Sequence, residues 1–440
     1  MKEYRDKLLK IAIPIMVSNL ISQIQMLIDR IFVGRLDITC MSAVGNASSP
    51  MWTTMGTVFS LTVGATILAS QAVGAGEREK AKAIIGSLFK YNNVLSTILF
   101  VFWFACPGIV YKLMGVDESI VDMSITYARI YSPVFITTGI GASVSALLQI
   151  SEKTKILVWY GIIRSGLNIV LDYAMIFGHF GLPRMEVAGA ALATTIAEYV
   201  GEIVVLIYLL KAKDLLLRPS VKEIATAKIG YYLTSIKMGI PVAAEDFAWN
   251  FGNLFLIAML NKVSIAAAGI YSIVFGVECV PIVLIGSLGN ATLTLAGQET
   301  GKKNYKGVKD VVRTALIMCA AIAAFVLVMF RLFPNTIMGW FTTDMDIIAA
   351  SAVYLLIVGI DLFPKSGNIV IGSGIKGYGD TRWMLGTQIF GTCFVIGMSA
   401  LVVLGLHLGM EQLFCVVVAD ETIRCIINYF KLRKISSRVA

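Results

Sequence analysis

The chain has 440 residues, of which 57% are hydrophobic and only 15% are charged. Soluble domains carry about 25% charged residues, so the polar groups of this chain are too few to enclose its apolar residues in water, and its surface must face lipid. The net charge of +9 does not indicate a nucleic-acid partner, because the basic residues fall in alternate loops between apolar segments.

Apolar segments long enough to cross a bilayer, which takes about 20 residues, recur along the whole chain. Some of them contain prolines or one or two charges, and spanning helices tolerate both. The sequence therefore predicts an all-α integral membrane protein. Its twelve transmembrane helices are expected over residues 11–34, 43–73, 86–111, 120–150, 156–178, 187–210, 238–261, 264–297, 314–332, 347–375, 383–406 and 410–430.

The Lys and Arg residues of the loops predict the topology. The N-terminus, the loops after every second helix and the C-terminal tail hold 26 of them, whereas the alternate loops hold 5. Cytoplasmic loops are enriched in Lys and Arg, so we expect both termini to be cytoplasmic. The expected location is a plasma membrane, with a prokaryotic cell or inner membrane favoured.

An internal repeat divides the chain. A shift of 227 residues, without a gap, aligns five pairs at equivalent points of helices 1 to 5 and 7 to 11: Pro14 with Pro241, Gln71 with Gln298, Gly74 with Gly301, Lys82 with Lys309, and Thr154 with Thr381. An even number of helices per half makes the halves parallel repeats. We expect two parallel six-helix bundles related by pseudo-two-fold symmetry, at residues 1–212 and 233–440, joined by a cytoplasmic linker at 213–232.

Motifs for catalysis and cofactor binding are missing from the sequence. The seven cysteines form no CxxC pair, and His179 and His407 are the only histidines. No GxxxxGK[ST] phosphate loop is present. We therefore expect neither an enzyme nor a cofactor.

Ionisable residues inside the predicted spans are the candidate site, because their burial in a membrane is costly unless they have a function or a partner. Asp29 lies near the end of helix 1, and Asn168 and Asp172 share one face of helix 5 at a spacing of four residues. Together they would form an oxygen-rich site for a proton, a small cation or a charged amine. Alternatively, Asp29 pairs with a neighbouring helix, or Arg164 is the counter-ion of these acids.

Further charges lie on other predicted spans. Glu198 and Glu202, four residues apart on helix 6, could carry a proton or line a solvated cavity. Asp361 and Lys365 are also four residues apart, and a simple ion pair is the favoured interpretation. The intramembrane candidates of the second half are Glu245, Asp246, Glu278, Asp361 and Lys365.

Three segments resemble the multidrug and toxic compound extrusion (MATE) family. They read IAIPIMVSNLISQIQMLIDRIFVGRL at 11–36, LNIVLDYAMIFGHFGLPRMEVAGAALATTIAEYVG at 167–201 and IKGYGDTRWM at 375–384. The resemblance covers essentially the whole chain. It implies secondary active export of amphipathic, usually cationic, organic compounds, driven by proton or sodium entry.

The resemblance also assigns residues. Asp29 matches the family's helix 1 acid, Asn168 and Asp172 match its helix 5 pair, and Gln25 and Thr194 occupy neighbouring places in the same cavity. With sodium as the coupling ion, Asp29, Asn168 and Asp172 would be its ligands. The chain departs from the family at 149–155, which reads QISEKTK rather than RGxGDT. It departs again at Lys365, where NorM-like members tend to carry an acid. We therefore expect coupling in the first half.

Two alternatives remain open at this point. A flippase for lipid-linked precursors shares the two-bundle plan, but its cavity would be richer in Lys and Arg to hold phosphates. An intramembrane enzyme or a receptor would not explain the internal repeat. The expected partners are membrane lipid and small organic substrates, with no nucleic acid, and the protein is expected to be a monomer.

Overall fold

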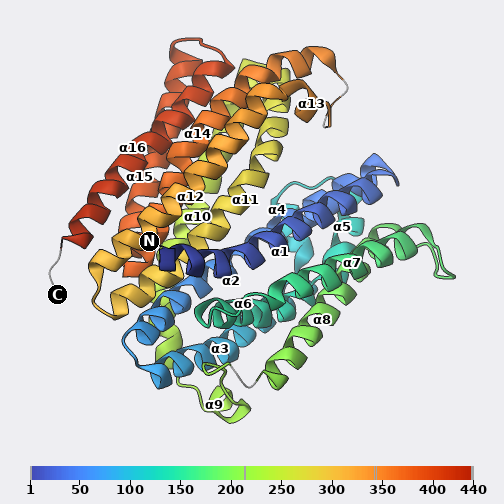
Figure 1. The fold of residues 1–440 in the computed structure, drawn as a ribbon. Helices are drawn as coiled ribbons and strands as arrows, with labels where there is room; N and C mark the ends of the chain where they lie inside the picture. Colours follow the sequence, from blue (N-terminus) through green and yellow to red (C-terminus); the bar gives the residue numbers. More distant parts are fainter. Residues whose placement is uncertain (1, 213–214, 341, 343, 438–440) are drawn as a thin grey trace. The chain divides into compact units, whose positions relative to one another are not determined.

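The computed structural model describes residues 2–212, 215–340, 342 and 344–437, and every regular element in these ranges is helical (Figure 1). Lys213 and Asp214 of the expected linker and Arg438 of the basic tail lie outside them. The first elements are α1 (Lys2–Gly34), α2 (Ile38–Gly74), α3 (Arg78–Ala105), α4 (Pro107–Leu113), α5 (Glu118–Tyr131), α6 (Val134–Ile150), α7 (Ile156–Phe177), α8 (Glu186–Lys211) and α9 (Val221–Ala225). The later ones are α10 (Ile229–Val263), α11 (Ile265–Gly301), α12 (Tyr305–Leu332), α13 (Pro334–Gly339), α14 (Met345–Tyr378), α15 (Thr381–Ala400), a π-helical continuation (Leu401–Gly405) and α16 (Met410–Ser436).

The predicted spans correspond to these helices. Within the described residues, eight helices are long and apolar enough to cross a membrane, and the bent pair of α5 and α6 forms a ninth span. Three further long helices, α7, α10 and α16, carry charged residues within their apolar runs. They complete the twelve helices expected from the sequence.

Two expected spans are interrupted, and a proline lies at each break. The segment 86–111 is divided at Cys106, and α4 begins with Pro107. The segment 120–150 bends by 47° between α5 and α6, with Pro133 at the junction. Proline removes a backbone donor and crowds the preceding turn, so these two positions break helices. By contrast, Pro14 and Pro241 lie within continuous helices.

Polar side chains set the starts of several helices. Asp117 accepts a hydrogen bond from the backbone of Ser119, Asn304 accepts one from Gly307, and Asp380 accepts one from Trp383. Each bond satisfies one of the free amide groups at a helix N-terminus. The ninth span is expected from the sequence to begin at 314, whereas the Asn304 cap starts α12 at Tyr305.

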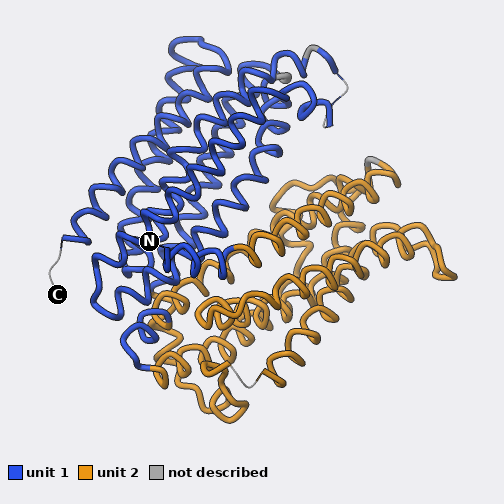
Figure 2. The backbone as a smooth tube through the Cα atoms, viewed as in Figure 1, with its two compact units in different colours: residues 1–12, 70–77, 238–440 blue, residues 13–69, 78–237 orange. Residues whose placement is uncertain are grey.

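The helices form two compact units (Figure 2). Unit 1 consists of residues 1–12, 70–77 and 238–440, and unit 2 of residues 13–69 and 78–237. The core of unit 2 is rich in aromatic residues, with Trp103 stacked on Phe135 at a centroid distance of 6.3 Å. The core of unit 1 is mainly aliphatic and is built from α10, α11, α14 and α16 around residues such as Leu260 and Leu355.

Within unit 1, the ends of α2 and α11 cross at glycines. A Cβ atom on Gly74 would lie 1.9 Å from the carbonyl oxygen of Gln298, and one on Gly301 would lie 2.0 Å from that of Gln71. The 227-residue shift exchanges these two contacts, so the crossing is reciprocal. Gln71 also donates from Nε2 to the carbonyl oxygen of Gly377, at 2.9 Å.

Candidate functional site

All five first-half candidates lie together in unit 2, on α1, α7 and α8. Gln25 is at the centre of the group. Its Nε2 donates to Asn168 Oδ1 at 2.6 Å and to Asp29 Oδ2 at 3.1 Å, and its Oε1 accepts from Ser165 Oγ at 3.0 Å. The Gln25 amide therefore ties α1 to α7 and fixes the orientation of both partners.

Thr194 on α8 completes this network. Asn168 Nδ2 donates to Thr194 Oγ1 at 3.2 Å, and the threonine hydroxyl donates to the carbonyl oxygen of Ala190 at 3.0 Å. Asn168 is fully buried. Its amide has a partner on each side, as a buried polar group requires, and it holds α1 and α8 to α7.

Asp29 and Asp172 bring two carboxyl groups together at the edge of the network. The groups lie within hydrogen-bonding reach of each other, and Asp172 is 1% exposed. Asp29 Oδ1 and both oxygens of Asp172 accept no hydrogen bond from any other described residue. Two carboxylates this close in a low-dielectric site cannot both stay ionised without a proton or a cation. The pair is therefore a candidate site for a proton or a cation.

Arg164 is held away from this pair by other partners. Its Nη1 is 2.7 Å from Glu198 Oε1, and its Nη2 donates to Ser22 Oγ at 2.6 Å. The guanidinium lies 5.5 Å from the centre of the Tyr160 ring, and the Tyr160 hydroxyl donates to Glu198 at 3.1 Å. Arg164 thus forms its ion pair with Glu198, and its charge reaches Asp29 without direct contact.

Glu202 lies one turn beyond Glu198 and is buried at 3% exposure. Its Oε1 has no hydrogen-bond partner among the described residues. The interpretation of Glu198 and Glu202 as a solvated cavity wall is therefore wrong for Glu202. The two acids also differ in their charge environment, because Glu198 forms an ion pair with Arg164 and Glu202 forms none with a described residue.

In unit 1, Lys365 lies between two acids. Its Nζ is 2.8 Å from Asp361 Oδ2, which confirms the expected contact, and it also contacts Glu278 Oε1 of α11. All three side chains are largely buried. The simple Asp361–Lys365 pair is therefore incomplete as a description, because the cation has two carboxylate partners.

A second charged group on α16 was missed by the sequence analysis. Arg424 Nη2 is 2.8 Å from Asp420 Oδ2 and 2.8 Å from Glu421 Oε1, and its Nη1 donates to Gln388 at 2.8 Å. Asn368 Nδ2 donates to Glu421 Oε2 at 2.6 Å. The signal was present in the sequence as Asp-Glu-x-x-Arg inside the last apolar run, a spacing that places these charges on one helix face.

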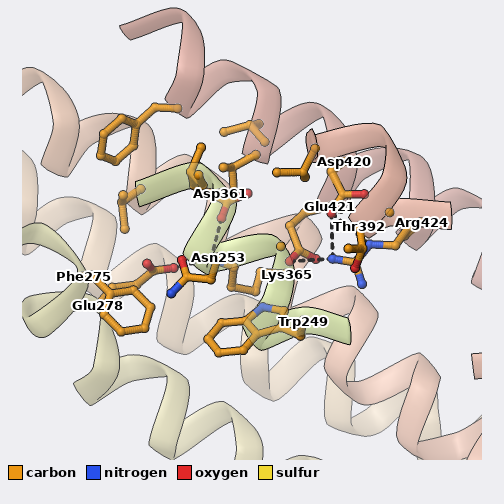
Figure 3. A pocket seen from close by; sticks show the side chains of 18 of the residues that line it. Trp249, Asn253, Phe275, Glu278, Asp361, Lys365, Thr392, Asp420, Glu421 and Arg424 are labelled. Carbon is orange, nitrogen blue, oxygen red and sulfur yellow. Dashed lines mark hydrogen bonds and ion pairs between the residues drawn. The ribbon is translucent and has the colours of Figure 1, made fainter. Parts of the chain in front are cut away.

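These two groups line one cavity of about 80 Å³ (Figure 3). Trp249, Tyr271 and Phe275 add aromatic surface to its wall. Its charged residues are four acids and two cations: Glu278, Asp361, Asp420, Glu421, Lys365 and Arg424. The cavity is therefore net acidic when all six are ionised.

Glu245 is not among the residues that line this cavity. It pairs instead with Lys376 of α14, at 3.4 Å. Of the second-half candidates, the structure thus brings Glu278, Asp361 and Lys365 together and places Glu245 in a separate ion pair.

Metal binding can be tested on the donor atoms. In the chain as described, no three His, Cys, Asp or Glu side chains converge as a metal site. The free oxygens of Asp29 and Asp172 suit a hard cation, but Asn168 Oδ1 already accepts from Gln25. Of the three expected sodium ligands, the carboxylates of Asp29 and Asp172 are therefore suitable for a cation. The amide oxygen of Asn168 already accepts a hydrogen bond from Gln25.

Buried carboxyl groups on the spans of a polytopic helical protein are typical of membrane transporters. The MatE family model matches residues 14–174 and 241–402 of the sequence. The chain belongs to the MatE family, and it is a transporter rather than an enzyme. The two matches begin 227 residues apart, at Pro14 and Pro241, which is the shift of the internal repeat.

Individual relatives agree with this assignment. "Probable multidrug resistance protein NorM" of Thermotoga maritima is 28% identical over 386 residues, 86% of this chain and 81% of the relative. "Probable multidrug resistance protein YoeA" of Bacillus subtilis is 23% identical over 415 residues, 92% of this chain and 89% of the relative. A variant of the Vibrio cholerae MATE transporter VcmN has the same fold, with a TM-score of 0.89, 18% identity and coverage of 98% and 97%. The predicted family and the all-helical membrane fold are confirmed.

Proposed function

We propose that this protein is an antiporter that exports amphipathic, cationic organic compounds in exchange for an inward-moving proton. The observation that carries the proposal is the Asp29–Asp172 pair, which has three carboxyl oxygens without a donor beside a fully partnered amide network. The two relatives named as probable multidrug resistance proteins support the substrate class.

Exchange follows if ion and substrate compete for the same carboxyl groups. Loading the ion from outside then weakens the hold on the substrate, and loading the substrate from inside weakens the hold on the ion, because coupling between two ligands is reciprocal. The six-helix halves at 1–212 and 233–440, joined by 213–232, would alternate between two states that differ in ion affinity.

A proton fits the Asp29–Asp172 pair better than sodium does. Two carboxyl groups within hydrogen-bonding reach can share one proton without moving any neighbour. A sodium ion prefers several oxygen ligands, and to recruit Asn168 Oδ1 it would have to share that atom with the Gln25 amide, 2.6 Å away. We therefore place proton coupling first and sodium coupling second.

The charge of the unit 1 cavity bears on the alternative function. A flippase for phosphate-bearing lipids needs excess positive charge, whereas here four acids outnumber two cations, and both cations already contact carboxylates. Acids beside aromatic rings suit the charge of an organic cation. A cavity of about 80 Å³ is smaller than the roughly 300 Å³ or more of a drug-sized pocket, so it would hold only part of such a compound. We propose Glu278, Asp361 and Lys365 as part of a substrate-binding region.

Flux from proteoliposomes tests the function. Vesicles are loaded with the fluorescent cation ethidium and given a proton gradient, a sodium gradient or no gradient. Each gradient is set so that the ion flows into the compartment that ethidium leaves. We expect the proton gradient to drive efflux. Asp29→Asn and Asp172→Asn should each abolish it, and the double variant should be no worse, because residues that act as a unit are not additive.

Asp122→Asn, an exposed acid on α5, is the matched control and should keep wild-type flux. Efflux driven only by the sodium gradient would show that sodium, rather than a proton, is the coupling ion. Wild-type efflux by Asp29→Asn would move the coupling site to Glu245, Glu278 or Asp361.

A further inference from the structure

A basic pocket of about 350 Å³ lies between α12 and α16, within unit 1. Lys309 and Arg313 of α12 and Arg433 of α16 line it. Lys309 and Arg313 are four residues apart and therefore share one helix face. Three cations thus converge at one end of a helix pair.

These cations have no counter-charge within the described part of the chain. Lys309, Arg313 and Arg433 are exposed, and none of them is in an ion pair with a described residue, whereas the nearby Lys431 pairs with Asp380 at 2.6 Å. The rest of the pocket wall is apolar or aromatic: Val312, Leu316, Leu432 and Tyr429.

The internal repeat identifies the equivalent of this pocket in the first half of the chain. The 227-residue shift places Lys82 at Lys309 and Gly86 at Arg313. In unit 2, the linker covers this place. Lys82 pairs with Glu223 at 2.7 Å, and a Cβ atom on Gly86 would lie 3.5 Å from Pro219. A carboxylate of the chain therefore occupies the first-half equivalent of the pocket.

We propose that the pocket between α12 and α16 binds the phosphate group of an anionic phospholipid from the cytoplasmic leaflet. The lipid would take the place that the Glu223 carboxylate takes in unit 2, and the two added cations, Arg313 and Arg433, supply hydrogen-bond donors for the oxygens of a phosphate, which arginine can bind with two parallel bonds. Basic pockets between spanning helices on the cytoplasmic side bind anionic headgroups.

The apolar surface beside the pocket can take the acyl chains. Ile317 on α12 is 57% exposed, and Ile426 on α16 is 52% exposed. Phe325, two turns further along α12 than Ile317, is 67% exposed. The cations lie at one end of the helix pair, and the exposed apolar residues follow along the two helices. This arrangement matches a lipid, which has a charged head and an apolar tail. The proposal does not depend on the transport function.

Lipid binding to the full chain, purified and delipidated in detergent, tests the proposal. Native mass spectrometry follows titrations with phosphatidylglycerol, with zwitterionic phosphatidylcholine and with inorganic phosphate. We expect tight binding of phosphatidylglycerol only. Each single change, Lys309→Gln, Arg313→Gln or Arg433→Gln, should weaken it about fivefold, and the triple variant about a hundredfold.

The matched control removes three exposed lysines outside the pocket, two from the linker and one from α10: Lys222→Gln, Lys228→Gln and Lys237→Gln. It has the same net charge as the triple variant and should bind phosphatidylglycerol as the wild type does. Unfolding temperatures without lipid verify that both variants are folded. Equal losses in the two triple variants, equal binding of both lipids, or binding of inorganic phosphate as tight as that of phosphatidylglycerol would each overturn the proposal.

Discussion

At the scale of single residues, the two polar centres differ in how their charges are satisfied. Lys365 and Arg424 each contact two carboxylates in unit 1. In unit 2, Asp29 and Asp172 leave oxygens without a donor. The ion pairs of unit 1 hold helices together and still leave two more acids than cations at the cavity, whereas the unpartnered oxygens of unit 2 are directly available to a ligand.

Replacing Lys365 tests the paired cluster. Lys365→Leu leaves Asp361 and Glu278 buried without their cation, and we expect a loss of about 3–5 kcal/mol in the free energy of unfolding. Asp361→Asn should cost less, because Lys365 keeps its contact with Glu278. Thermal unfolding of the purified variants in detergent measures both.

The double change of Asp361→Asn with Lys365→Leu distinguishes a pair from a triad. An isolated pair predicts that the double variant is more stable than Asp361→Asn alone. The triad predicts the reverse, since Glu278 then loses the one cation that it contacts among the described residues. Lys306→Leu, an exposed site on α12, serves as the control.

At the scale of elements, the close crossing of α2 and α11 requires glycines, which have no side chain to separate the two backbones. Gly74→Ala would place a methyl group 1.9 Å from a backbone oxygen, and backbone cannot yield as a flexible side chain can. We expect Gly74→Ala to lower the free energy of unfolding by about 1–3 kcal/mol or more. Gly56→Ala on the same helix, where a Cβ atom has nothing within 4 Å, should be neutral or slightly stabilising. Equal unfolding temperatures for the two variants would contradict this account.

The linker helix α9 is anchored by Glu223. The carboxylate pairs with Lys82 at 2.7 Å and accepts from Ser220 in a capping box. The hydrogen bond from Lys82, followed by those from Ser220, lowers the pKa of Glu223 to about 2. The ordinary value is about 4.3, so the anchor is complete above that pH and is lost as the pH falls toward 2.

Hydrogen exchange of residues 219–227 measures the linker anchor. Protection in the wild type should decline below about pH 4.3. Glu223→Gln should show the reduced protection already at neutral pH, without that acid dependence. Lys222→Gln, on the same short helix, is the control. Unchanged protection in Glu223→Gln at neutral pH would show that Glu223 does not anchor α9.

At the scale of the whole molecule, the charge distribution predicts the topology. The split of 26 to 5 Lys and Arg residues between alternate loops leads us to expect both termini in the cytoplasm. A reporter that is active only in the cytoplasm, fused in turn to each terminus, should give signal in both fusions. Signal from one terminus alone would require an odd number of spans.

The membrane class, the helices and part of the first-half cluster could be predicted from the residues alone. Hydropathy and charge act locally and add along a chain, so a helix can be predicted from its own residues. The spacing of Asn168 and Asp172 likewise lies within one helix. Asp29 was grouped with them from its place near the end of helix 1, whereas Gln25 and Thr194 came from the resemblance to a known family. The contacts in unit 2 agree with that grouping.

Which charges neutralise one another could not be predicted, because the partners lie on helices far apart in the sequence. Lys365 has an acid four residues away, yet it also contacts Glu278, 87 residues away, and Arg164 pairs with Glu198 of α8 rather than with the acids of its own neighbourhood. These choices depend on which helix faces pack together, and no local pattern encodes that. A buried charge must find a partner in space, and packing determines which partner is within reach.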